Sequence, residues 1–303
     1  MLPTRQGAFR LFRFSGIDVF LHWSWFLIAA YEISAGSRRY SSPVWNALEY
    51  VALFGIVTMH EFGHALACRS VGGRANQIVL WPLGGVAYVD PPPRPGAVLW
   101  SIAAGPLVNV VLVPVFVILG ILSRSSGFAD AAPNVHALLH YVALINFGLL
   151  IFNMLPVYPL DGGQILRALL WFPLGRAKSL MVTAIIGFVG VAGFVALALM
   201  SQSVWVGILA AFAGMRCWAG FQQARALMQL AEAPRHDGFA CPSCKVAPPK
   251  GALWVCGKCR TAFDTFETHA TCPNCGTQFQ QTRCLECGAT SPIETWGVPA
   301  HAQ

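Results

Sequence analysis

The stretch LEYVALFGIVTMHEFGHALACR, residues 48–69, decides how this chain folds. It is long and apolar enough to cross a lipid bilayer as one helix, which takes about 20 residues. His60-Glu61-Phe62-Gly63-His64 stands inside it. Because residues i and i+4 share one helix face, both imidazoles can reach the same metal ion. A carboxylate at the centre of a span costs roughly 2.5–3.5 kcal/mol, so Glu61 indicates a functional site, with this side chain as a general base.

The composition of the whole chain agrees with a membrane protein. Of 303 residues, 55% are hydrophobic and 11% are charged, whereas a soluble domain carries about 25% charged residues. This excludes an ordinary soluble enzyme, and the high hydrophobicity excludes a disordered chain. For a membrane protein, the net charge of +7 favours basic loops on the cytoplasmic side of the membrane over binding to nucleic acid.

Six apolar stretches predict a mainly α, polytopic six-helix transmembrane bundle. They are Ile17–Ala35, Leu48–Arg69, Ala97–Leu122, Ala137–Leu155, Ser179–Met200 and Val204–Gly220. The short connection Ser201-Gln202-Ser203 predicts a tight hairpin of the last two spans. Lys and Arg fall mainly in segments that are cytoplasmic if the N-terminus is, so both termini are expected in the cytoplasm. The excess of Arg over Lys is typical of a GC-rich genome. The expected location of this multi-pass protein is a bacterial plasma membrane.

Two segments between the spans predict irregular structure. Ala75–Asp90 is apolar around a central Pro-Leu-Gly-Gly, which predicts a short membrane-associated β-hairpin. Pro156–Pro173 contains too many prolines and glycines for one regular helix. Its Asp161 offers the third ligand that a catalytic zinc site needs. Alternatively, Asp161 caps a short helix over Gly162–Leu170, and both roles can hold.

Four motifs, in this order, resemble the site-2 protease family of intramembrane zinc metalloproteases. They are HEFGH at 60–64, PLGGV at 82–86, AGPLVN at 104–109 and NMLPVYPLDGG at 153–163. The resemblance implies that His60, His64 and Asp161 bind a catalytic zinc and that Glu61 is the catalytic base. It also implies the hydrolysis, by a zinc-activated water, of peptide bonds in or near the transmembrane segment of a single-span membrane-protein substrate.

Other polar and small residues of this region support weaker predictions. Asn153 either assists catalysis by hydrogen-bonding the substrate or the intermediate, or only packs and caps its helix. Asn109 is interpreted as a packing contact beside Gly105. A substrate helix must unwind locally to expose its carbonyl groups, and the hairpin around Gly84 and Gly85 is predicted to pair with the unwound strand.

Two alternative functions use the same fold. A proteolytically silent scaffold would bind membrane proteins without cleaving them, but such a protein has no need to keep Glu61 between two histidines. A zinc transporter or sensor would treat zinc as cargo, but no second row of intramembrane acids marks an ion path. The intramembrane endopeptidase is therefore the preferred hypothesis.

The C-terminal part belongs to a different class of domain. Its Cys-x2-Cys pairs are Cys241 and Cys244, Cys256 and Cys259, Cys272 and Cys275, and Cys284 and Cys287. Joining each pair to the next predicts two structural zinc sites, each with four cysteine ligands, in a double zinc ribbon. Basic and acidic residues balance there, which favours a cytosolic protein partner over nucleic acid. The predicted domains are a six-span metalloprotease domain at 1–222, a helical linker at 223–237 and the ribbons at 238–303.

Overall fold

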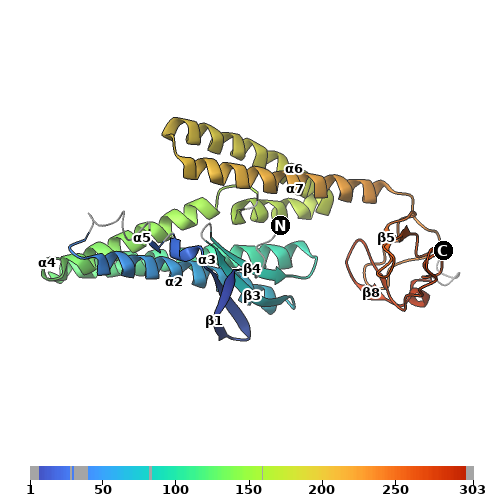
Figure 1. Cartoon of the computed structure of the whole chain (residues 1–303), viewed down its shortest axis with the longest axis horizontal. Helices are drawn as coiled ribbons and strands as arrows, with labels where there is room; N and C mark the ends of the chain where they lie inside the picture. Colours follow the sequence, from blue (N-terminus) through green and yellow to red (C-terminus); the bar gives the residue numbers. More distant parts are fainter. Residues whose placement is uncertain (1–6, 28, 31–39, 82–83, 159, 298–303) are drawn as a thin grey trace. The chain divides into compact units, whose positions relative to one another are not determined.

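A computed structural model of the chain describes residues 7–27, 29–30, 40–81, 84–158 and 160–297 (Figure 1). The contacts within it divide the chain into two compact units, Met1–Phe221 and Gln222–Gln303. The first unit contains the long helices and a four-stranded sheet. The second contains the end of the last long helix, the eight cysteines of the Cys-x2-Cys motifs and two small sheets.

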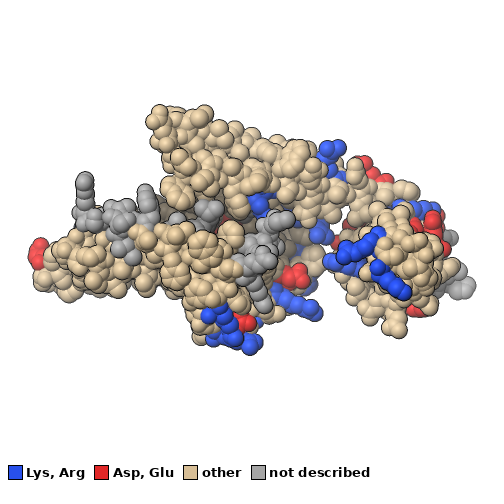
Figure 2. All heavy atoms as spheres, in the orientation of Figure 1, with Lys and Arg blue, Asp and Glu red and all other residues tan. Residues whose placement is uncertain are grey.

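Five helices of the described residues are long and apolar enough to cross a membrane. They are α2 (Pro43–Ser70), α3 (Pro95–Ser125), α5 (Pro133–Asn153), α6 (Asp161–Ser201) and α7 (Val204–Glu232), with the short α4 (Phe128–Ala131) between α3 and α5. They confirm five of the six predicted spans. On the face drawn in Figure 2, charged side chains gather in a few clusters and leave long stretches of these helices uncharged. The chain is a mainly helical, multi-pass membrane protein.

The prediction of a spanning helix over Ile17–Ala35 is wrong at its start. Ile17–His22 is strand β2, which pairs antiparallel with β1 (Ala8–Phe14). Every second residue of β2, beginning with Ile17, is buried, and this period of two is that of a strand rather than a helix. Residues 31–35 of the predicted span lie outside the described residues. The six-helix bundle is therefore corrected to five candidate spans in the described part of the chain.

The predicted β-hairpin is present, but within a larger sheet. β3 (Arg74–Trp81) and β4 (Gly84–Asp90) pair antiparallel, and their connecting residues Pro82 and Leu83 lie outside the described residues. The strand order is β1-β2-β3-β4, with β2 and β3 parallel. Buried residues of β2 and β3 pack with the second half of α2 in one core. β4 is consequently an outer strand of a sheet that covers the helix carrying the HEFGH motif.

Helical structure is interrupted at the start of the segment Pro156–Pro173, which is rich in proline and glycine, and again just after its end. α5 ends at Asn153, α6 starts at Asp161, and Pro159 between them lies outside the described residues. Gly175, with φ 75° and ψ 173°, then divides α6 into a short first piece and a long second piece. Only two residues separate α6 from α7, so the predicted tight helical hairpin is confirmed.

The second unit is built around two short hairpins, β5–β6 (Trp254–Val255 and Ala262–Phe263) and β7–β8 (Thr282–Arg283 and Thr290–Ser291), with the 3-10 turn η2 (Ile293–Trp296) at its end. The linker predicted at 223–237 is helical only as far as Glu232. Beyond it, Arg235 forms a bridge with Pro249 and a 2.8 Å ion pair with Glu286. The end of the predicted linker is therefore held on the cysteine-rich fold.

Candidate metal centre

Three side chains from two helices converge in the first unit. His60 and His64 lie one turn apart on α2, and Asp161 is the first residue of α6. The Nε2 atoms of the two histidines are 3.1 Å apart, and Asp161 Oδ2 lies 3.0 Å from His60 and 3.4 Å from His64. Tetrahedral zinc with bonds of about 2.0–2.1 Å would separate such ligand atoms by about 3.3 Å. The donor set and its spacing therefore fit a zinc ion.

The opposite nitrogen of each imidazole has its own partner. His64 Nδ1 donates to the carbonyl of Ser101 at 2.9 Å, and His60 Nδ1 donates to Asn109 Oδ1 at 2.6 Å. Such contacts fix the ring orientation and leave Nε2 free for a metal. The interpretation of Asn109 as a packing residue is corrected, because it contacts His60 directly. Sequence reasoning missed this role because AGPLVN shows that the asparagine shares a helix with Gly105, but not which side chain it meets.

Glu61 is buried beside the two histidines and contacts the sheet. Only 6% of this residue is exposed, and its carboxylate oxygen Oε2 accepts a 2.8 Å hydrogen bond from the backbone N–H of Ala87 on β4. This N–H is therefore directed at α2. The contact holds the carboxylate at the edge of the sheet, next to the converging imidazoles.

Two glycines leave the space that these side chains occupy. A Cβ on Gly105 would stand 2.8 Å from His60 Nε2 and would also overlap His64. A Cβ on Gly85 would lie 2.6 Å from the Oε1 atom of Glu61. Gly84, the other glycine predicted to meet substrate, has φ +129°, and apart from its chain neighbours no atom of the described residues lies within 4 Å of where its Cβ would stand. The motifs around Gly105 and Gly85 therefore have a steric role at the centre.

Asp161 is not positioned by a capping contact of its own. The N-cap residue of α6 is Leu160, and within the described part of the chain no side-chain hydrogen bond caps this helix start. Gly162 and Gly163 pack without side chains against the backbone of the preceding turn, including Met154 and Tyr158. This close approach turns the first residue of α6 toward the two histidines, as the ligand alternative required.

Asn153 is placed less tightly than the other predicted residues. It is the last residue of α5 and is half-buried. Among the hydrogen bonds described for residues 7–297 with their gaps, none joins it to Glu61 or to the three converging side chains. Its assignment as a residue that assists catalysis stays a prediction.

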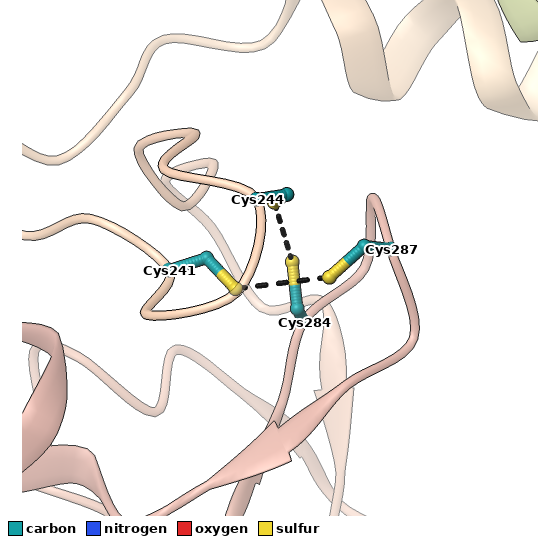
Figure 3. Close-up of side chains that lie close together, drawn as sticks. All are labelled: Cys241, Cys244, Cys284 and Cys287. Carbon is teal, nitrogen blue, oxygen red and sulfur yellow. Dashed lines mark hydrogen bonds between the residues drawn. The ribbon is translucent and has the colours of Figure 1, made fainter. Parts of the chain in front are cut away.

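The eight cysteines form two groups, but not those expected from consecutive pairs. The first pair joins the last one: Cys241 Sγ lies 3.7 Å from Cys287, and Cys244 Sγ lies 3.8 Å from Cys284 (Figure 3). The inner four cysteines form the second group, with Sγ–Sγ distances of 3.6 Å. Tetrahedral Zn–S bonds of about 2.3 Å separate sulfur atoms by about 3.8 Å, so both groups fit zinc.

The nested pairing has a cause in the backbone. Phe239, just before the first cysteine pair, forms a bridge with Gly297, and Ala240 N–H donates to Trp296 at 2.8 Å. Trp296 is buried against Phe266 in the same core as the outer cysteines. The two ends of the domain are therefore joined, which brings the first and the last knuckle together.

The thiols of the inner group already differ in acidity. Hydrogen bonds from the hydroxyl and the backbone N–H of Thr261 lower the pKa of Cys259 to about 5, whereas burial raises the pKa of Cys272 to about 11. Their sulfur atoms lie 3.6 Å apart. Both thiols lose their protons when they bind a cation, so metal binding by this group depends on pH.

A third group, His236, Asp264 and Glu267, has a structural explanation. Burial favours a higher pKa for Asp264, but hydrogen bonds from the backbone N–H of Gly251, from His236 and from the N–H of Phe266 outweigh it and lower the pKa. Both carboxylate oxygens are thus engaged by donors of the protein. The pair of His236 and Asp264 holds the segment after α7 on the cysteine-rich fold rather than forming an open metal site.

Two imidazoles and one carboxylate that converge, with a second carboxylate beside them, all within a multi-pass helical protein, form an arrangement typical of an intramembrane metallopeptidase centre. Residues 49–132 and 125–197 match the profile of Peptidase family M50. A zinc metalloprotease of Methanocaldococcus jannaschii is 36% identical over 180 residues, which cover 59% of this chain and 50% of that protein. The putative zinc metalloprotease Rip3 of Mycobacterium tuberculosis is 29% identical over 229 residues, covering 68% and 57%.

A solved structure agrees with these sequence matches. The site-2 protease from Methanocaldococcus jannaschii superposes with a TM-score of 0.52 and 28% identity, over 71% of this chain and 95% of that chain. The present chain belongs to peptidase family M50, the site-2 proteases. It spans about half the length of the curated relatives that it matches.

Proposed function

We propose that this protein is an intramembrane zinc endopeptidase that hydrolyses peptide bonds in or near the transmembrane segment of membrane-protein substrates. The observation that carries the proposal is the convergence of His60 Nε2, His64 Nε2 and Asp161 Oδ2 within 3.4 Å, with Glu61 adjacent in the sequence and buried. Family membership supports the assignment of these three ligands and of the base.

The chemistry divides between the ion and the residues around it. A bound zinc ion supplies Lewis acidity toward a water molecule and a peptide carbonyl. Glu61 accepts the proton of the attacking water and returns it to the leaving amine. The N–H of Ala87 keeps the Glu61 carboxylate in place. Burial of the four side chains strengthens every charge interaction among them, because little water screens the site.

The sheet suggests how a substrate reaches Glu61. A peptide within a helix has its carbonyls engaged in i→i−4 hydrogen bonds, so the substrate must unwind before it reacts. β4 is an outer strand, and its Ala87 N–H touches the proposed base. A substrate strand that adds to β4 at Gly84 and Gly85 would therefore place its backbone beside Glu61. Asn153 is proposed to assist catalysis by hydrogen-bonding the substrate or the intermediate.

Cleavage by the purified full chain tests this function. Labelled single-span peptides in proteoliposomes should be cut in or near their apolar segment; a chelator should stop the reaction and added zinc should restore it. Peptides N-methylated next to the cut should resist cleavage if strands add to β4, since they cannot donate the backbone hydrogen bond. If a zinc-loaded chain cuts no peptide of the panel, the scaffold alternative is correct; cleavage that resists chelation would refute the zinc mechanism.

We further propose that the two cysteine groups bind structural zinc and that their domain docks a cytosolic protein. Five crossings put the start of α2 and the end of α7 on opposite sides, and the basic residues after α2 favour the cytoplasm for the C-terminal unit. Free thiols persist in that reducing compartment. A C-terminal reporter that is active only in the cytoplasm checks this location, and a signal from outside would refute it.

Metal counting checks the nested pairing of the cysteines. Cys241→Ser with Cys287→Ser should remove one zinc per chain, because both residues belong to one group. Cys241→Ser with Cys259→Ser should remove two, since each group loses a ligand. Elemental analysis of the purified full-length variants provides the count. The reverse result, two for the first pair and one for the second, would restore the consecutive pairing.

A further inference from the structure

A pair of asparagines lies behind His60, away from the converging ligand atoms. Asn109 on α3 and Asn146 on α5 are both completely buried. Asn109 Nδ2 donates to Asn146 Oδ1 at 2.8 Å, and Asn146 Nδ2 donates to the backbone carbonyl of Asn109 at 3.0 Å. Asn109 Oδ1 is left to accept from His60 Nδ1 at 2.6 Å. The three residues thus form one hydrogen-bonded chain across three helices.

The donor and acceptor at each step of this row of hydrogen bonds are fixed by Asn146, at the end remote from His60. A backbone carbonyl only accepts hydrogen bonds, so the amide nitrogen of Asn146 must face it. The Asn146 oxygen must then face Asn109, which turns the Asn109 nitrogen toward Asn146 and the Asn109 oxygen toward His60. An acceptor at this position requires a proton on Nδ1 of His60. The same ring therefore presents an unprotonated Nε2 to the other ligands.

The position of the pair also argues for a function. Burying an amide costs roughly 1–3 kcal/mol unless it is hydrogen-bonded, and polar side chains inside spans are uncommon. An apolar residue at position 146 would satisfy packing between α3 and α5 without this requirement. Without Asn146, Asn109 could turn either its amide oxygen or its amide nitrogen toward His60. Only the oxygen leaves His60 with an unprotonated Nε2 that can bind a cation.

We propose that Asn146 is a positioning residue for the metal centre: acting through Asn109, it selects the form of His60 that carries its proton on Nδ1 and binds metal through Nε2. This inference rests on the proposed zinc site. It extends the site to a fourth helix, α5, which like α3 contributes none of the three ligands.

Metal affinity of the full chain tests the inference without relying on activity. Zinc and cobalt dissociation constants of the centre are measured by chelator competition, with the His60→Ala variant subtracted to remove the cysteine-bound ions. Asn146→Leu, of similar size, should weaken binding about 10- to 100-fold, as loss of a partner of a ligating histidine does. Asn46→Leu is the matched control, because Asn46 is also buried but its Nδ2 has no hydrogen-bond partner among the residues that the structure describes. This variant should bind metal as the unmodified chain does.

A second substitution separates positioning from a loss of folding. In the Asn146→Leu chain, Asn109→Asp offers an oxygen to His60 in either orientation and should recover most of the affinity. Unchanged affinity in Asn146→Leu would overturn the inference, and so would a loss that Asn109→Asp fails to recover. If the unmodified chain binds no metal beyond its His60→Ala variant, the proposed zinc site itself fails, and the inference fails with it.

Discussion

Glu61→Gln is expected to abolish peptide-bond cleavage while the chain keeps its metal. Glutamine retains the size of the side chain and an oxygen that can accept from Ala87 N–H, but it cannot take a proton from water. General-base catalysis contributes about 10²- to 10⁴-fold to a rate, so the initial rate on a labelled single-span peptide should fall by at least about 100-fold. Metal affinity, measured in parallel, should stay the same because Glu61 is not a proposed ligand.

Glu49→Gln provides the matched control for this result. Glu49 is a second buried carboxylate of α2 and accepts a 2.7 Å hydrogen bond from the Tyr40 hydroxyl, away from the metal ligands. Its replacement should leave the cleavage rate within about threefold of the unmodified chain. A Glu61→Gln chain that cleaves at a comparable rate would exclude Glu61 as the base, even if cleavage requires zinc.

Gly105→Ala is expected to remove the metal centre altogether. The new methyl group would stand 2.8 Å from His60 Nε2 and would overlap His64, so both imidazoles must leave the positions in which they converge with Asp161. The neighbouring backbone cannot yield, because α2 and α3 are already in close contact where a Cβ on Gly63 would lie 2.7 Å from the Ala104 carbonyl. Metal affinity and cleavage should both fall by more than about 100-fold, the loss expected when ligand geometry fails.

Gly120→Ala in the same helix separates this effect from general damage to α3. Apart from its neighbours along α3, no atom of residues 7–297, outside the gaps in that range, lies within 4 Å of the position that its Cβ would occupy, and alanine favours a helix more than glycine does. This variant should bind metal and cleave like the unmodified chain. Wild-type affinity in Gly105→Ala would show that the imidazoles are not held where the structure has them, and would refute the proposed ligand set.

Much of the centre could be predicted from local sequence. His60 and His64 share a helix face by spacing alone, and an acid within a span indicates a function because the bilayer disfavours it. The long apolar stretches predicted five of the spans correctly, since a bilayer requires length and apolarity from any helix that crosses it. Asp161 could be predicted as a ligand from its place in a segment interrupted by prolines and glycines. Its distance from the histidines could not be predicted from the sequence.

Pairings between distant segments could not be predicted in this way. The sequence of β2 by itself also fits the start of an apolar span, and its pairing with β1 and β3 makes it a strand. The four Cys-x2-Cys pairs permit several groupings, and the bridge between Phe239 and Gly297 selects the nested one. In each case the local pattern fits two structures about equally well, and contacts remote in the sequence decide between them.

The sequence by itself determined which chemistry this protein carries, because imidazole, carboxylate and thiolate ligands are recognisable from residue type and short spacing. Only the tertiary structure decided how these groups are oriented. It turned Asp161 toward α2, placed Ala87 N–H against Glu61, and linked His60 through Asn109 to Asn146. Hydrogen bonds and ligand geometry depend on distances of a few ångströms between helices, and helix packing, rather than any local pattern, sets those distances.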